Sequence, residues 1–173
     1  ALLEALATGL SASDEPFLER TLDDRAKGVR LVAAVLLSQL PASAFAQRAR
    51  ARAQGLLELE RGLLRKTLKV NLPDKPDKAE ERDGVDGKGA IAGLYNAGPR
   101  QLQLAQRLAQ VPVSALAAQL SMPVAELVER AIGNEFALPL LAGLCQSAAR
   151  TPDPDAVRAL ATLAYKPETG FLY

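Results

Sequence analysis

The sequence contains no histidine and no tryptophan, and its 173 residues include one cysteine. The absence of histidine excludes histidine-assisted nucleophilic catalysis and the common histidine-based metal sites. Cys145 has no second cysteine to pair with, so an intrachain disulfide is excluded, and its apolar neighbours predict a small buried side chain. A chain without a disulfide framework is compatible with a reducing cytosol, and we expect a cytoplasmic protein.

Long hydrophobic runs are also missing. The longest, Phe136–Cys145, is about half of the ~20 apolar residues that a membrane helix needs, and it contains Pro139. We therefore expect no membrane association. No signal peptide is visible, but the chain begins at Ala1 inside an amphipathic pattern and ends at Phe171-Leu172-Tyr173, so we expect a fragment of a longer protein.

The net charge is close to zero, because 21 Lys and Arg are balanced by 20 Asp and Glu. This balance gives no long-range electrostatic argument for binding nucleic acid or an anionic membrane. Aromatic residues make up 4% of the chain, whereas 49% is hydrophobic and much of that is Ala and Leu, the strongest helix formers. The composition predicts a single all-α domain, 1–173, with a closely packed core.

The clearest helix lies between Leu22 and Leu40, where a polar turn precedes a run of apolar residues. One continuous helical face is formed by Val29, Val32, Ala33, Leu36, Leu37 and Leu40. Leu31 and Val35 add a second apolar stripe on another side. A helix that is apolar on two sides is expected to have neighbours on two sides, as in the inner layer of a stacked helical array.

Shorter patterns predict further helices before and after this one. Pro16 lies in the first turn of one helix, Ser43 is expected to cap another, and Ser114 to cap a third. A short helix is expected at Lys78–Arg82, and the C-terminal half predicts helices over about 102–111, 114–120, 123–131, 135–150 and 154–165.

The middle of the chain departs from the helical period. Leu68-Lys69-Val70-Asn71-Leu72 alternates apolar and polar residues, as in a half-buried strand, and a strand needs a partner. Leu57-Glu58-Leu59 across an Arg61-Gly62 turn would form a small hairpin with it, and a continuous helix through Leu64 is the alternative. From Pro73 to Pro99 the chain is rich in Gly, Pro and charge, which predicts a long loop of the functional or mobile kind.

The segment Asp153–Ala161 echoes Asp24–Val32, because both contain an acidic turn followed by Val-Arg at the start of an Ala/Leu helix. The Leu22–Leu40 pattern resembles the second half of a HEAT-type repeat, in which a turn Asp and a helix Arg commonly interact between adjacent units. The two copies lie far apart, so the resemblance implies an irregular right-handed α-α superhelix. Its HEAT-like part would span about 1–57, a strand and loop excursion about 58–99, and the C-terminal helices about 100–165.

A longer series of motifs resembles an uncharacterised bacterial family of HEAT-like helical proteins, known only as a domain of unknown function. The matching pieces are Asp23-Asp24-Arg25-x-Lys27-x-Val29-Arg30, Leu40-Pro41-x-Ser43-Ala44, Leu72-Pro73, Arg82-Asp83-Gly84-Val85 and Gly98-x-Arg100…Leu104…Leu108-Ala109-x-Val111-Pro112. Where the family usually has tryptophans, this chain has Leu102, Gln103 and Leu116. The resemblance implies a multiprotein assembly with an AAA-type ATPase or a von Willebrand A-type protein, and it implies no reaction.

No catalytic, nucleotide-binding or metal-binding motif is complete. Gly84-Val85-Asp86-Gly87-Lys88-Gly89 suggests a P-loop, but Gly89 is followed by Ala90 and no Ser or Thr follows the lysine. Asp83 and Asp86 suggest a Ca²⁺ loop whose other ligand positions are not filled. No Ser-x-x-Lys occurs, and Cys145 lacks a histidine partner. We therefore expect no enzyme activity, no cofactor and no metal.

A basic excess lies between Ala44 and Lys69, where seven basic residues (Arg48, Arg50, Arg52, Arg61, Arg65, Lys66 and Lys69) stand against Glu58 and Glu60. Such a stripe is the electrostatic footprint of nucleic-acid binding, although no aromatic residues are interleaved for base stacking. A solvated basic face is the favoured interpretation, and nucleic-acid binding through the 48–69 region is the alternative.

The leading functional hypothesis is a non-enzymatic scaffold that binds another protein, because the pattern is repeat-like and lacks a catalytic constellation. The candidate partner-binding residues are Arg82, Asp83 and Gly84 in the long loop, together with Arg48 and Arg52.

Overall fold

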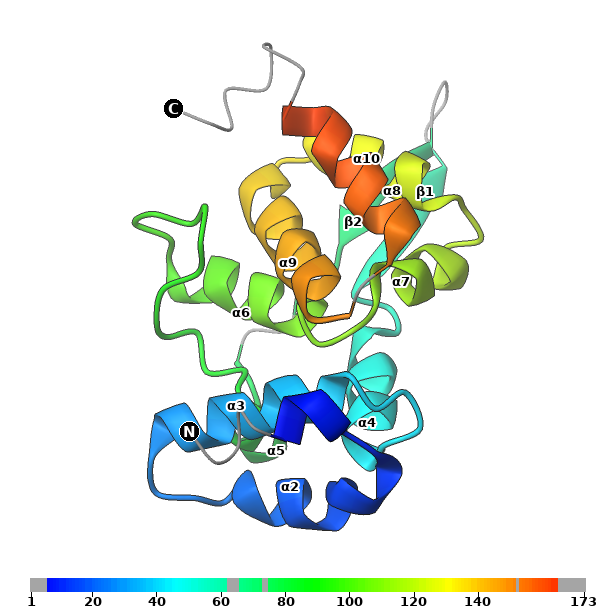
Figure 1. The fold of residues 1–173 in the computed structure, drawn as a ribbon. Helices are drawn as coiled ribbons and strands as arrows, with labels where there is room; N and C mark the ends of the chain where they lie inside the picture. Colours follow the sequence, from blue (N-terminus) through cyan, green and yellow to red (C-terminus); the bar gives the residue numbers. More distant parts are fainter. Residues whose placement is uncertain (1–5, 62–65, 73–74, 152, 165–173) are drawn as a thin grey trace.

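The computed structural model describes residues 6–61, 66–72, 75–151 and 153–164. It is mainly helical with one small antiparallel two-stranded hairpin. Figure 1 shows two layers stacked on each other: helices from the N-terminal third form one layer, and the C-terminal helices with the hairpin form the other. Gly62 of the predicted turn, Arg65, Pro73 and the last nine residues of the chain lie outside the described residues, and Arg61 of that predicted turn belongs to strand β1.

The N-terminal layer consists of two short 3₁₀ turns, Ala7–Gly9 and Ala12–Asp14, and helices α2 (Glu15–Thr21), α3 (Lys27–Ser38) and α4 (Ala44–Ala53). Pro16 lies in the first turn of α2 as predicted. Ser43 caps α4, since its hydroxyl accepts the Ala46 N–H at 3.1 Å. The helices share an apolar cluster, which contains Leu18, Leu22, Ala33, Ala34, Leu36, Leu37 and Phe45.

Helix α3 is covered less completely than its sequence pattern suggests. Ala33, Leu36 and Leu37 of the predicted face are buried. Leu31 of the second stripe is 39% exposed; it lines an apolar surface pocket together with Val35, and it also faces the cavity between α3 and the C-terminal layer. Helix α3 therefore has a neighbour on this side as well, but the second stripe is only partly covered by it.

The hairpin is confirmed, and the alternative of a continuous helix is wrong. Strands β1 (Leu57–Arg61) and β2 (Lys66–Val70) are antiparallel, with Leu57 opposite Val70 and Leu59 opposite Leu68. Leu57 and Leu68 are buried in the core of the C-terminal layer. Arg130 of helix α8 (Val124–Ile132) donates to the Lys66 carbonyl, and this hydrogen bond connects the hairpin to that helix.

The C-terminal layer contains α6 (Pro99–Leu108), α7 (Val113–Gln119), α8 (Val124–Ile132), α9 (Ala137–Arg150) and α10 (Pro154–Ala164). Helices α6 and α9 cross closely at Gly143, where an added Cβ would lie 2.8 Å from the Leu108 Cβ and 2.9 Å from the Ala105 carbonyl oxygen. The Ser147 hydroxyl donates to the Val111 carbonyl at 2.6 Å. These contacts make α6 and α9 the centre of this layer.

Two local predictions in this layer are wrong. Ser114 lies inside α7 instead of capping it, because the helix already begins at Val113 after Pro112. Cys145 is exposed, because the buried face of α9 is formed by Leu140, Leu141, Leu144 and Ala148 and the cysteine lies beside that face.

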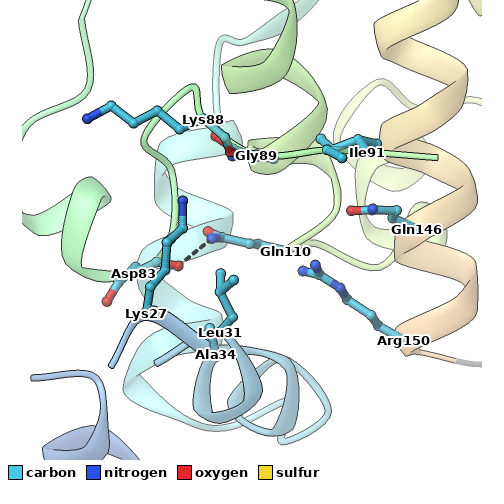
Figure 2. A pocket seen from close by; sticks show the side chains of 13 residues that line it. Lys27, Leu31, Ala34, Asp83, Lys88, Gly89, Ile91, Gln110, Gln146 and Arg150 are labelled. Carbon is cyan, nitrogen blue, oxygen red and sulfur yellow. Dashed lines mark hydrogen bonds between the residues drawn. The ribbon is translucent and has the colours of Figure 1, made fainter. Parts of the chain in front are cut away.

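The predicted excursion contains helix α5 (Lys78–Arg82), as expected, followed by a loop over residues 83–98. Buried Ile91 and Leu94 join a small cluster with Leu102, Ala105 and Ala142, so the loop is packed against α6 and α9. Between this loop, α3, α6 and α9 lies a cavity of about 170 Å³ (Figure 2). No helix among the described residues is long and apolar enough to cross a membrane.

Candidate functional site

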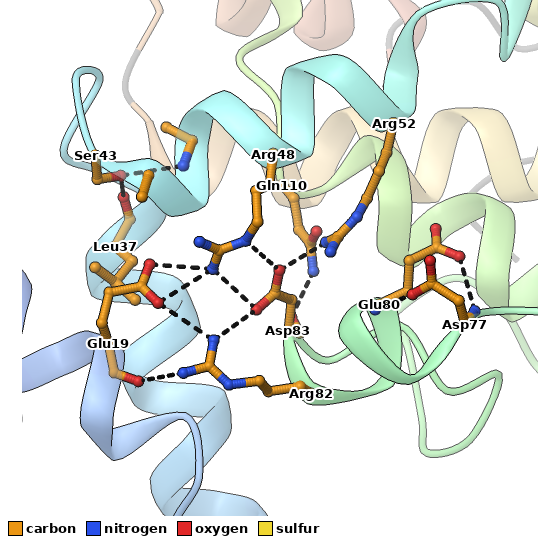
Figure 3. A network of polar contacts seen from close by, with 12 residues as sticks. Glu19, Leu37, Ser43, Arg48, Arg52, Asp77, Glu80, Arg82, Asp83 and Gln110 are labelled. Carbon is orange, nitrogen blue, oxygen red and sulfur yellow. Dashed lines mark hydrogen bonds and ion pairs between the residues drawn. The ribbon is translucent and has the colours of Figure 1, made fainter.

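An ionic network centred on Asp83 lies where helices α2 and α4 of the N-terminal layer meet the end of helix α5 (Figure 3). Asp83 follows the last residue of α5, and it is 1% exposed. Its carboxylate accepts hydrogen bonds from Arg48 Nε at 3.0 Å and from Arg52 Nη1 at 2.7 Å. Arg48 and Arg52 are four residues apart on α4, so one helical face presents both guanidinium groups to the same carboxylate.

Glu19 extends the network to α2. Its carboxylate accepts from Arg48 Nη2 at 3.0 Å and from Arg82 Nη1 at 3.2 Å. Arg82 also forms a two-point contact with Asp23, at 2.7 Å and 3.0 Å. The hydrogen bond from Arg82 lowers the pKa of Asp23, and the same bond raises the pKa of Arg82.

Helix α5 is tied to α6 by a second, more deeply buried ion pair. Arg107 donates from Nε to Glu80 at 2.8 Å and from Nη2 at 3.1 Å, a bidentate geometry that favours strong binding. Gln110 adds a hydrogen bond to the Asp83 carbonyl at 2.7 Å. Helix α5 therefore bridges the two layers through polar contacts on both sides.

A third polar connection organises the glycine-rich loop. Lys27 of α3 pairs with Asp86 at 2.6 Å, and Gln106 Oε1 accepts the N–H groups of Asp86 and Gly87 at 3.1 Å and 2.9 Å. Burial raises the pKa of Asp86, but hydrogen bonds from Lys27, the Lys88 amide and Gln106 outweigh it, and the net shift is downward. The amides that a P-loop would offer to phosphate are here bound to a glutamine side chain.

The sequence-predicted residues are brought together by the fold. Arg48, Arg52, Arg82 and Asp83 form one network, and Gly84 follows it with φ of +95°, a conformation that favours glycine. Their side chains bind one another within the chain, which gives them a structural role. Partner binding through these residues stays a prediction.

Part of the basic excess between residues 44 and 69 is matched by contacts inside the chain. Arg48 and Arg52 bind carboxylates, Arg50 donates to the Pro41 carbonyl at 2.9 Å, and Lys69 lies 3.7 Å from Glu60. The side chain of Arg61 and all of Arg65 lie outside the described residues. Arg48 and Arg52 are therefore partners in a part-buried network and not members of the solvated basic face that was expected. Nucleic-acid binding through the 48–69 region stays a prediction.

Tyr95 is a surface feature that the sequence analysis did not single out. It is 88% exposed, although its neighbours Ile91 and Leu94 are buried and are joined by a hydrogen bond from the Leu94 N–H to the Ile91 carbonyl at 3.0 Å. Asn96 follows with a positive φ of 58°. The sequence shows an aromatic residue among small residues in this loop. It does not show that Ile91 and Leu94 are the residues that become buried and leave Tyr95 exposed.

The described residues contain no cluster of three or more His, Cys, Asp or Glu side chains that could hold a metal ion. A model described as a family of unknown function (DUF5691) matches residues 1–170. The chain belongs to this family. Neither the curated proteins nor the solved structures include a match to this DUF5691 chain. Membership covers nearly the whole sequence and assigns no activity.

Proposed function

We propose that this DUF5691 chain is a non-catalytic scaffold that binds another protein, with Tyr95 at the centre of the contact surface. The observation that carries this proposal is the 88% exposure of Tyr95 in a loop that buried Ile91 and Leu94 hold against α6 and α9. The ring of a tyrosine held out from an anchored loop offers apolar area that a partner would remove from water on binding.

Tyrosine suits this role for physical reasons. It combines a large apolar ring with a hydroxyl group, and it is enriched among the residues that contribute most to protein–protein binding. Because the loop is already packed, a partner would order few additional bonds on binding, which reduces the entropic cost.

The HEAT-like arrangement and the class of partner belong to the same proposal. The two echo segments share a local structure: the Asp24 carboxylate accepts the Ala26 N–H at 2.8 Å, and the Asp153 carboxylate accepts the Asp155 N–H at 3.0 Å. Both acidic turns thus lead into a helix, α3 and α10. On the basis of the motif resemblance, the partner is an AAA-type ATPase or a von Willebrand A-type protein.

Site-specific crosslinking tests the proposal. A photoreactive phenylalanine derivative at position 95, in the full-length protein in its native cells, is expected to form an adduct with one protein. Val157 on α10, which is also exposed, is the control position and is expected to form none. The absence of an adduct at position 95 contradicts the proposal.

The captured protein then allows an affinity measurement. Tyr95→Ala is expected to weaken binding by roughly thirtyfold, the effect of losing a contact of about 2 kcal/mol, while Tyr95→Phe retains most of it. Both variants should keep the melting temperature of the parent, because the side chain is exposed. Equal affinity of Tyr95→Ala and the parent would show that the loop is not the contact surface.

A further inference from the structure

The cavity between the two layers has a basic and polar lining. Its volume is about 170 Å³, and its walls come from α3, α6, α9 and the loop over residues 83–91. Lys27, Lys88 and Arg150 contribute positive charge, and Asp83 is the one acidic residue among its described lining residues. Figure 2 shows Arg150 and Gln146 extending from α9 toward the cavity.

The charges around this cavity do not cancel. The Asp83 carboxylate is bound by Arg48 and Arg52, so it does not compensate a charge inside the cavity. Lys27 is compensated by Asp86. Arg150 has one hydrogen bond, from Nη1 to the Ala109 carbonyl at 3.3 Å, and no carboxylate of the described residues lies within ion-pair distance of it.

Arg150 is therefore a half-buried cation without a counter-charge in the part of the chain that the structure describes. Burial lowers the pKa of its guanidinium, which shows that the surroundings disfavour the positive charge. A guanidinium has five N–H donors, and Arg150 uses one of them. Such an arrangement costs stability in an empty cavity and favours an anion in a filled one.

The neighbouring amides add neutral donors and acceptors at the same place. Gln146 lies one turn before Arg150 on α9, and its side chain has no hydrogen-bond partner within the described ranges. Gln110, which also lines the cavity, donates to the Asp83 carbonyl through Nε2. Lys88 extends from the rim, where an exposed ammonium group attracts anions from solution.

We propose that this cavity binds a small oxyanion, a phosphate or carboxylate group, with Arg150 and Gln146 as its direct contacts. The planar fork of arginine matches both groups in a bidentate manner. A cavity of roughly 150 Å³ in another protein holds benzene, so 170 Å³ fits inorganic phosphate or a short carboxylic acid. This site is separate from Tyr95 and does not rest on the proposed protein contact.

Isothermal titration of the purified chain with inorganic phosphate, and separately with succinate, in chloride buffer tests the site. One saturable site is expected, and the anion that binds more tightly identifies the phosphate or carboxylate source. Arg150→Met is expected to weaken binding at least about tenfold, the loss of one charge-assisted hydrogen bond. Arg25→Met, in the exposed turn before α3, is the control and should bind as the parent does.

Thermal unfolding without added anion separates ligand binding from a structural role. Arg150→Met should melt at the parent temperature or above it, because the change removes an uncompensated buried charge. Gln146→Leu keeps the arginine and should weaken anion binding several-fold. If Arg150→Met does not fold, the affinity of Gln146→Leu tests the proposed anion site. No saturable binding of either anion, or parent-like affinity in both variants, overturns the proposal.

Discussion

The Asp83 carboxylate concentrates the electrostatic interactions of the N-terminal layer at one buried point. It contacts Arg48 and Arg52 directly, and Arg82 lies 3.5 Å from it. A buried carboxylate is stable in this environment because several guanidinium groups replace the water that it has lost. Arg52 has this carboxylate as its one ion-pair partner among the described residues, whereas Arg48 also pairs with Glu19, and Arg82 with Glu19 and Asp23. Because these pairs share partners, the network is expected to respond as a unit.

Asp83→Asn tests this dependence. The amide keeps the shape but removes the charge, which leaves Arg48 and Arg52 without their shared partner, and the free energy of unfolding should fall by about 3–5 kcal/mol. Urea denaturation measures the change. Asp155→Asn, in an exposed pair with Arg158 at 3.5 Å, is the control and should change stability by less than about 1 kcal/mol. A loss below 1 kcal/mol in Asp83→Asn would contradict this interpretation of the network.

Helix α5 is held in place mainly by polar contacts. It is five residues long, too short to be stable alone, and it is held by Asp77 at its start and by Arg107 of α6. Arg107 is almost fully buried, and its Nη1 has no partner in the described part of the chain. The element therefore depends on one buried ion pair with an incompletely satisfied cation.

A double-mutant cycle on this pair measures its worth. Glu80→Leu and Arg107→Met should each destabilise the protein by about 3–5 kcal/mol, because each leaves one buried charge alone. The double variant should recover most of that loss, since two apolar side chains can pack where the ions were. Additive losses in the double variant would show that the two side chains do not act as a pair.

The α6–α9 crossing depends on a missing side chain. An added Cβ at Gly143 would meet backbone and Cβ atoms of α6 within 3.0 Å, and these atoms cannot move aside as a flexible side chain could. Gly143→Ala should therefore lower the free energy of unfolding by about 1–3 kcal/mol. Gly28→Ala on α3 meets no atom within 4 Å and should instead raise it by about 0.4–1 kcal/mol. Thermal unfolding of both variants compares the two glycines, and a stabilised Gly143→Ala would contradict the close crossing.

For the whole molecule, two apolar clusters are joined by helix α4, which contributes Phe45 to one and Ala49 and Ala53 to the other, and by polar contacts of residues 80–86. The cluster under α2 and α3 is separate from the larger one that contains the hairpin and α8. Polar contacts of residues 80–86 run between them, to Asp23 and Lys27 on one side and to Arg107 and Gln110 on the other. Ionic links make the connection between the layers sensitive to pH.

Acidification should loosen the N-terminal layer first. The pKa values of Asp23 and Asp86 are lower in the folded chain than the roughly 3.9 of an unfolded aspartate. Their contribution to stability is therefore complete above that value and is lost as pH falls through the lower folded pKa values. Hydrogen exchange at decreasing pH should show α2 and α3 losing protection before α6 and α9.

Asp86→Asn provides the comparison for this experiment. The variant lacks one of the titrating links, so the stability of its N-terminal layer should depend less on pH below about 4 than that of the parent. A single acid transition with the same midpoint in both layers, and the same pH dependence in the variant, would exclude this mechanism.

Local chemistry explains which parts of the structure are readable from the sequence. The helix at 27–38, the cap at Ser43 and the short helix at 78–82 depend on residues a few positions apart. The alternation at 68–72 likewise indicated a strand, which the structure places two residues earlier, at Lys66–Val70. Four charged residues were also candidates for partner binding from the sequence alone: Arg48, Arg52, Arg82 and Asp83. Their identity as candidates came from the sequence, because composition and spacing are local properties.

The arrangement of these elements depends on contacts between distant residues. Arg48 meets Asp83 across 35 positions, and this contact turns a basic stripe and a loop motif into one internal network. The same packing of α9 on α6 places Cys145 at the surface and Arg150 beside a cavity, although both lie on one helix. Tyr95 is exposed because Ile91 and Leu94 are anchored instead. Hydrophobic periodicity specifies that a helix has an apolar face, but only the shapes and charges of its neighbours determine which residues at the edge of that face become buried, paired or exposed.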